Sequence, residues 1–194
     1  MKPVRIGAVT RVVLDRLSRL GFRPQAFSLA EKLKEARSVL ICMPSNLNLL
    51  ATAKDFLTSF ADVFEGRKIS VLLPFLKTEG YLPSPAGYDV IYPQETDLKA
   101  FSIPGELFLH RVRQRGFDVS LDLDLEDGFF NRYLCFKCGV ALRIGPQGRN
   151  AFPLYNVQLS IMLDRSDSRE TYRVMANMLK DLLPPVCTAG STAV

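Results

Sequence analysis

The chain has 194 residues, of which 47% are hydrophobic and 23% are charged, and its formal net charge is +5. This length supports one domain with a sizeable core, and this composition excludes an intrinsically disordered chain. No apolar run reaches the roughly 20 residues that a membrane-spanning helix needs. The N-terminus has no uninterrupted apolar segment typical of a signal peptide, so we expect a cytoplasmic protein.

The positive charge is concentrated at the N-terminus. Residues 1–37 hold nine Lys and Arg against three acidic residues, a balance of +6, whereas the remainder holds 16 basic and 17 acidic residues, a balance of −1. An excess confined to one end favours a basic arm and argues against a nucleic-acid groove spread over the fold. We therefore expect no nucleic-acid partner.

Residues 8–20 of this arm have the apolar spacing of an amphipathic helix. The apolar residues on its predicted face are Val9, Val13, Leu17 and Leu20. Such a helix can bind an anionic membrane surface, which would make residues 1–20 a peripheral membrane contact. Alternatively, the helix packs on the domain and leaves its arginines in solvent. Both interpretations stay open from the sequence.

Beyond the arm, short apolar runs alternate with helical patterns. We predict strands at residues 38–43, 69–73, 88–92, 117–122, 140–144 and 155–162. We predict helices at residues 28–33, 49–64, 104–115, 127–138 and 168–183, with Ser28 capping the first and Pro104 opening the third. This alternation indicates an α/β fold, a single Rossmann-like three-layer domain with a mainly parallel sheet. The expected organisation is an arm at 1–36, the domain at 37–184 and a disordered tail at 185–194.

Acidic residues gather where the strand at 117–122 should end. If residues 117–125 form one long strand, Asp118, Asp122 and Asp124 share a face and would repel one another unless a cation such as Mg²⁺ lies between them. Basic neighbours could also compensate them, and these are Arg111, Arg113, Arg115 and Arg132. In the simpler interpretation the strand ends near Asp122, Asp124 and Glu126 are solvated, and Asp127 caps the next helix. We predict no metal site.

Two turns of the predicted sheet are candidates for a shared ligand site. In open α/β sheets, ligands bind beyond the carboxyl ends of the strands. The turn after 38–43 and the acidic turn both have this position. The predicted ligand-binding residues are Asn46, Asn48, Thr52, Asp122, Asp124 and Glu126. No Gly-rich dinucleotide fingerprint or Walker A loop is present, so we predict no cofactor, and no catalytic set can be assembled around the single His110.

The cysteines allow three interpretations. Cys42 lies in an apolar strand pattern, where a buried thiol is the ordinary state. Cys135 and Cys138 have the C-x-x-C spacing of a redox pair or of half a zinc site, and simple packing in an aromatic-rich helix is the third possibility.

Two segments resemble a known family. Residues 117–123, FDVSLDL, are similar to a Y-D-L-V-I-D-L segment, and residues 138–145, CGVALRIG, are similar to a G-A-K-x-R-I-G ending. Both belong to the N-terminal domain of heptosyltransferase-like glycosyltransferases of lipopolysaccharide synthesis. The chain also resembles a short uncharacterised bacterial family related to them. The resemblance implies one half of a GT-B glycosyltransferase.

Two departures from that family bear on the function. Asn48 stands where the family carries an Asp thought to act as the catalytic base, and an amide cannot accept a proton as a carboxylate does. The family's second domain, which binds the nucleotide-sugar, has no counterpart in this chain. The resemblance thus implies a diverged, non-catalytic relative that binds a glycan or protein partner in cell-envelope biogenesis, with a peripheral position on the inner membrane as a further expectation. The alternatives are a glycosyltransferase completed by a partner chain and a peripheral membrane assembly protein.

Overall fold

The structure is a computed structural model that describes residues 26–74, 88–99, 103–126, 128–148, 154–161 and 167–183. Several sequence-based predictions concern residues outside these ranges. They are the helix at 8–20, the membrane contact at 1–20, the tail at 185–194 and the helix cap Asp127.

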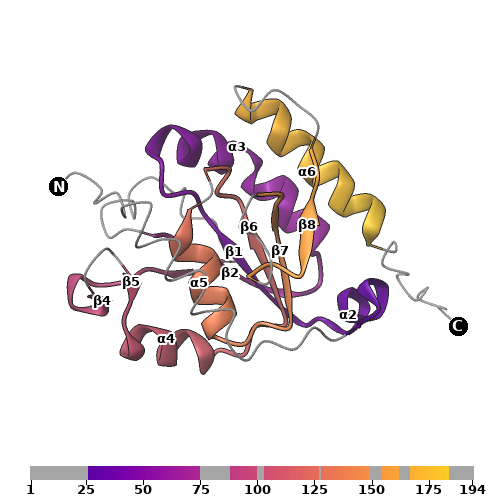
Figure 1. Cartoon of the computed structure of the whole chain (residues 1–194). Helices are drawn as coiled ribbons and strands as arrows, with labels where there is room; N and C mark the ends of the chain where they lie inside the picture. The colour runs from indigo at the N-terminus through magenta and orange to yellow at the C-terminus, as the bar shows by residue number, and fades with distance from the viewer. Residues whose placement is uncertain are drawn as a thin grey trace, which may run out of the picture.

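A six-stranded sheet forms the centre of the molecule (Figure 1). Its strands are β1 (Ser38–Cys42), β2 (Lys68–Leu72), β3 (Asp89–Ile91), β6 (Val119–Asp122), β7 (Leu142–Pro146) and β8 (Val157–Leu159). Their order is β3-β2-β1-β6-β7-β8, and every neighbouring pair is parallel. This is the strand order of a doubly wound Rossmann sheet, so the predicted fold class is confirmed.

The sheet changes its direction of winding between β1 and β6. β1 pairs with β2 on one side and with β6 on the other, and Cys42 is in register with both Leu72 and Asp122. The two central strands therefore end at the same level. In doubly wound sheets, the turns after these two strands diverge and leave a crevice between them.

Helices cover both faces of the sheet and make three layers (Figure 1). On one face lie α2 (Leu29–Glu35), α3 (Leu47–Val63) and α6 (Ser168–Leu182), and on the other lie α4 (Glu106–Arg113) and α5 (Phe129–Lys137). Successive residues of β1 alternate between the two cores: Ile41 packs in the first and Cys42 in the second. Burial on both faces explains why β1 reads as a continuous apolar run.

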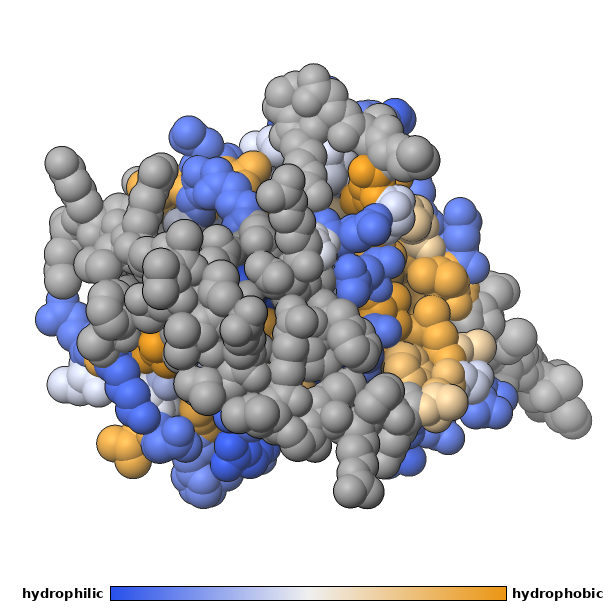
Figure 2. Space-filling view, in the orientation of Figure 1, coloured by the Kyte–Doolittle hydropathy of each residue, from blue (hydrophilic) through white to orange (hydrophobic). Residues whose placement is uncertain are grey.

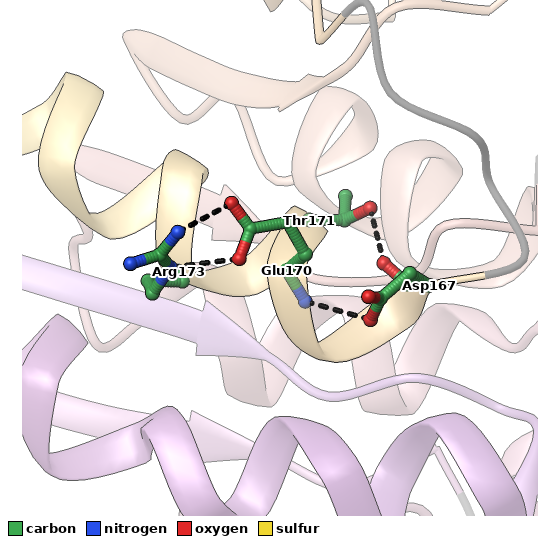
Figure 3. Close-up of polar contacts among 4 residues, drawn as sticks. All are labelled: Asp167, Glu170, Thr171 and Arg173. Atoms are coloured by element: carbon green, nitrogen blue, oxygen red, sulfur yellow. Dashed lines mark hydrogen bonds and ion pairs between the residues drawn. The ribbon is translucent and has the colours of Figure 1, made fainter.

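Polar side chains cap the helices on the first face. Ser28 accepts a hydrogen bond from the Glu31 amide at the start of α2, which confirms the predicted cap. Asp167 accepts one from the Glu170 amide at 3.0 Å, and its carbonyl accepts another from the Thr171 hydroxyl (Figure 3). Each cap satisfies amides that have no partner inside the helix.

Pro104 has a different role from the predicted one. It lies in β5 (Ile103–Pro104), which pairs antiparallel with β4 (Leu98–Lys99) after a short 3₁₀ turn at Glu95–Asp97. Helix α4 begins only at Glu106, with Gly105 as its N-cap. The Gly105 amide donates to the Asp97 carbonyl at 2.7 Å, and a Cβ at Gly105 would lie 2.9 Å from that oxygen. This close approach keeps Pro104 and Gly105 outside the helix, so α4 begins two residues later than the proline signal indicates.

Helix α2, which the sequence assigns to the arm, packs on the domain. Leu33 is buried in the first core. The Arg67 guanidinium donates to the carbonyls of Leu33 and Ala36 at 2.9 and 3.2 Å, and so fastens the end of α2 to the segment before β2.

Apolar side chains gather at one side of the surface. Figure 2 shows them where Figure 1 places β8, α2 and the C-terminal end of α6. Partly buried residues on these elements are Leu29, Val157 and Met178. Within the described residues, no helix combines the length and the apolar character needed to cross a membrane.

The cap of α6 gives the first prediction. Replacing Asp167 with Ala should lower the free energy of unfolding by about 1 kcal/mol, because the Glu170 amide loses its acceptor. The matched control is Asp181→Ala, which removes the same charge near the C-terminal end of α6, where a negative charge is unfavourable. Urea denaturation should show a loss for Asp167→Ala and none for Asp181→Ala. Equal losses would contradict the capping role.

Candidate functional site

The candidate site lies at the switch point of the sheet and comprises two turns, one after β1 and one after β6. The first comprises residues 43–46 and leads into α3, and the second begins at Leu123. The Leu123 amide donates to the Cys42 carbonyl at 3.0 Å, so the pairing of the strands continues into the turns. All six predicted ligand-binding residues lie in these turns, at the end of β6 or in the first two turns of α3.

Asn46 joins the two turns. Its side-chain oxygen accepts from the amides of Asn48 and Leu49, which caps α3, and its side-chain nitrogen donates to Glu126 at 2.8 Å. Asn48 and Glu126 are exposed, whereas Asn46 and Thr52 are half-buried. The Thr52 hydroxyl donates to the Asn48 carbonyl one turn earlier at 3.2 Å. The structure therefore brings Asn46, Asn48, Thr52 and Glu126 together at one surface.

Asp122 and Asp124 form the buried part of the same site. Their exposed fractions are 1% and 3%, so the expectation that Asp124 is solvated is wrong. The Asp122 carboxylate accepts from the Asp124 amide at 2.9 Å, and the Asp124 carboxylate accepts from the Glu126 amide at 3.0 Å. Each aspartate thus binds the amide two residues ahead, as in an Asx turn. β6 ends at Asp122 as predicted, but the carboxylates turn inward and hold the loop.

Asp122 also contacts two other parts of the fold directly and a third through Asn131. One oxygen accepts from the Asn131 side chain of α5 at 2.8 Å, and the other accepts a hydrogen bond from the Tyr155 hydroxyl. The same Asn131 nitrogen donates to the Met43 carbonyl at 3.0 Å. Asp122 therefore connects β6, α5 and the segment before β8, and through Asn131 it reaches the turn after β1.

Burial changes the protonation of this pair. Loss of water is the largest cause that raises the pKa of Asp122, and the neighbouring Asp124 charge also raises it. The hydrogen bonds from Tyr155, the Asp124 amide and Asn131 lower it, and the net pKa is about 7. Burial likewise raises the pKa of Asp124 to about 6. Near neutral pH the two carboxyl groups therefore exchange protons with solvent as a coupled pair.

Two glycines make room for the buried acids. A Cβ at Gly145 would lie 2.5 Å from the Tyr155 ring, and a Cβ at Gly128 would lie 2.3 Å from an Asp124 oxygen. Gly145 therefore allows the ring to lie against β7 and to reach Asp122. Gly128 is the N-cap of α5, the helix whose predicted cap was Asp127.

Arg143, in the R-I-G segment, has a structural role. Its guanidinium donates to the carbonyls of Val140 and Leu154 at 2.6 and 2.7 Å, and it lies over the Phe136 ring. The side-chain oxygen of Asn156 accepts from the Arg143 amide at 2.7 Å. These bonds hold the segment that presents Tyr155 to Asp122.

The row of aspartates expected from a single long strand does not form. Asp118 lies before β6 and accepts from the amides of Arg37 and Ser38 at 2.8 and 3.0 Å, which joins the start of β1 to β6. Arg111 and Arg115, expected as compensating charges, pair with Asp97 and Asp89. Among the described residues, no group of three or more His, Cys, Asp or Glu could hold a metal ion.

Sequence reasoning missed Asn131 and Tyr155, the side-chain donors to Asp122. Asn131 lies inside a predicted helix, where an inward-facing amide has no distinctive pattern. Tyr155 begins a predicted strand and is 33 residues from Asp122. Gly145 did not indicate the contact either, because it follows the strand predicted at 140–144, whereas in the structure it lies inside β7 against the Tyr155 ring.

The raised pKa values predict how stability depends on pH. The folded pKa of Asp122, about 7, exceeds its ordinary value of 3.8, so the folded state binds this proton more tightly. The resulting stabilisation is complete below the ordinary pKa and is lost as the pH rises through 7. The free energy of unfolding should therefore be higher at pH 5 than at pH 8.

Asp122→Asn should remove much of this difference, because an amide cannot titrate. Asp62→Asn, an exposed aspartate of α3, should retain the wild-type pH dependence. Urea denaturation across pH 5–8 compares the three proteins. A wild-type stability that rises from pH 5 to pH 8 would contradict a carboxyl pair with raised pKa values.

Gly145→Ala should lower the free energy of unfolding by about 2 kcal/mol, because the new methyl group displaces the Tyr155 ring. The effect is steric, since the Gly145 φ angle lies outside the left-handed region that disfavours alanine. In a Tyr155→Ala background the same change should cost little. A double-mutant cycle in urea measures this coupling, and equal costs in both backgrounds would exclude the contact as the cause.

The comparisons with known proteins give one structural match. No protein-family model matches the chain, and no curated protein matches it. The solved structure of E. coli ADP-heptose LPS heptosyltransferase II is similar over 76% of this chain, at 17% sequence identity and a TM-score of 0.49. The match spans 44% of that enzyme, so this chain corresponds to less than half of its length.

Proposed function

We propose that this chain is a non-catalytic relative of the heptosyltransferase-like glycosyltransferases and binds a glycan in cell-envelope biogenesis. The glycan would occupy the crevice between the turns after β1 and β6. The substrate class comes from the sequence resemblance at residues 117–123 and 138–145. The place of binding comes from the topology, because the switch point of a doubly wound sheet is where such folds bind ligands.

The hydrogen bond between Asn46 and Glu126 carries this proposal. It joins the two turns at the switch point. One of its partners, Glu126, is exposed, and so is Asn48, whose amide donates to the Asn46 side chain. An amide and a carboxylate side by side can accept from and donate to the hydroxyl groups of a sugar. Thr52 adds a hydroxyl oxygen one helical turn behind Asn48.

The states of the acidic residues favour binding over catalysis. Asn46 in the first turn and Asn48 at the start of α3 supply amides, and neither amide can act as a general base toward a sugar hydroxyl. Asp122 and Asp124 are buried, and internal donors occupy their carboxylates. In our proposal these two aspartates support the turn, while the exposed polar groups contact the ligand.

The second candidate is glycosyl transfer by a complex in which a partner chain supplies the nucleotide-sugar site. One observation favours it: Glu126 places an exposed carboxylate in the crevice, where it could act as a general base. Under either candidate we propose a cytoplasmic location, with the basic residues 1–20 contacting the anionic inner membrane.

Binding can be tested by titrating the full chain with lipopolysaccharide core oligosaccharide and following amide chemical shifts. We expect shifts at residues 46–52 and 123–126. Asn48→Ala and Glu126→Gln should each weaken binding by roughly two- to tenfold, the effect of losing one hydrogen bond.

The matched control is Gln158→Ala, an exposed amide on the edge strand β8, which should bind as the wild type does. Shifts that map away from the crevice, or variants that bind unchanged, would count against the site. Sugar transfer from ADP-heptose by the chain alone would refute the non-catalytic assignment, and transfer only with a partner chain would favour the second candidate.

A further inference from the structure

The two cysteines that lie close together in the structure are not the two that the C-x-x-C spacing suggests. The sulfur atoms of Cys42 and Cys135 lie 3.6 Å apart, and both residues are buried in the core between the sheet and α4–α5. Cys138 is half-buried, and its thiol donates to the Leu109 carbonyl of α4 at 3.5 Å. Within the described residues no zinc site can form around these thiols. The close pair is therefore Cys42–Cys135, not the C-x-x-C pair.

We propose that Cys42 and Cys135 are a redox modification site, at which an intramolecular disulfide forms and fastens α5 to β1. This goes beyond the proposed binding function and does not depend on what the crevice binds.

The geometry permits the bond after a small movement. A disulfide has a sulfur–sulfur distance of about 2.05 Å, so the two atoms must approach by roughly 1.5 Å. The residues lie on facing elements, at the last position of β1 and in the last turn of α5, and their side chains already point at each other. Cys138 instead directs its thiol toward α4.

A disulfide between Cys42 and Cys135 would also restrain the turn after β1. Asn131 lies one helical turn before Cys135 on the same buried side of α5. Asn131 holds the Met43 carbonyl, and Met43 directly follows Cys42. Two adjacent contacts thus attach α5 to the end of β1. A covalent bond at the first contact would restrain the second and, with it, the turn that carries Asn46.

Hydrogen peroxide is a sufficient oxidant. One cysteine thiolate attacks a peroxide oxygen and becomes a sulfenic acid, while the other oxygen leaves as hydroxide and takes up the thiol proton to form water. The second thiol then attacks the sulfenic sulfur, the two sulfurs bond, and the hydroxyl group leaves with the second proton as another water. Two thiols and one peroxide give one disulfide and two waters.

Because both thiols are buried, we expect the disulfide to form slowly and to be reduced slowly. Burial raises the pKa of Cys42, and the hydrogen bond and the charge of Cys135 raise it further, so little thiolate is present near neutral pH. The thiolate is the reactive form, and a buried thiol must also become accessible by local opening. Oxidation should therefore be faster at higher pH, and the formed disulfide should resist reductants until the protein opens.

The test uses the full chain with Cys138→Ser and Cys187→Ser, which leaves only the proposed pair. After treatment with hydrogen peroxide at pH 8.5, intact mass should fall by two hydrogen masses, and a peptide map should show residues 42 and 135 linked. The unfolding midpoint should rise, because the bond closes a loop between residues separated by 93 positions. Amide exchange at residues 43–48 should slow by about tenfold or more.

Cys42→Ala in the same background should show none of these changes, and its thermal melt checks that it folds. The four-cysteine protein should give the same 42–135 link. A 135–138 link, dimers as the sole product, or sulfinic acid without a cross-link in protein that remains folded would each overturn the proposal.

Discussion

The Asp122 carboxylate is the group on which the arrangement of the crevice depends. It lies at the end of the central strand β6 and accepts hydrogen bonds from the Asp124 amide, the Asn131 side chain and the Tyr155 hydroxyl. A buried carboxylate is costly unless such donors compensate for the lost water. These three donors come from the following turn, from α5 and from the segment before β8, so satisfying one acid fixes the positions of three parts of the fold.

The same constraint explains residues that otherwise have no evident role. The Tyr155 ring occupies the space that a side chain at position 145 would need, which explains Gly145. An Asp124 oxygen occupies the corresponding space at position 128, which explains Gly128. Arg143 binds the Leu154 carbonyl and so holds the residue before Tyr155. The R-I-G segment that resembles the glycosyltransferases therefore serves the packing around Asp122. Arg143 and Gly145 hold Tyr155 in position and are not among the exposed residues of the site.

The candidate site has a buried acidic pair and an exposed set of polar side chains. Asp122 and Asp124 are turned inward, and their burial raises both pKa values, whereas Asn48 and Glu126 remain at the surface. The Asn46–Glu126 hydrogen bond connects the outer groups of the two turns. On the α5 side of the sheet, Cys135 lies against Cys42 at the end of β1, and Asn131 donates to the Met43 carbonyl in the turn that follows. The exposed groups thus lie on two turns that internal hydrogen bonds hold in place.

The sequence by itself determined the parts of this protein that depend on local patterns. We could predict the strand β1, the alternation of strands with helices and the cap at Ser28. Each produces a pattern within a few residues, because burial on both faces and helix capping act locally. Topology then placed the six predicted site residues at one end of the sheet. The alternation at residues 117–125 could not tell a solvated acidic face from a buried one.

Only the tertiary structure decided that difference, because the donors that allow Asp122 to be buried lie 9 and 33 residues away. The pairing of Cys42 with Cys135 spans 93 residues and was equally hidden behind the nearer C-x-x-C spacing. The start of α4 was misplaced for a related reason, since the Gly105–Asp97 contact overrode the proline signal. Contacts between distant segments have no periodic pattern, so they become visible only when the chain is folded.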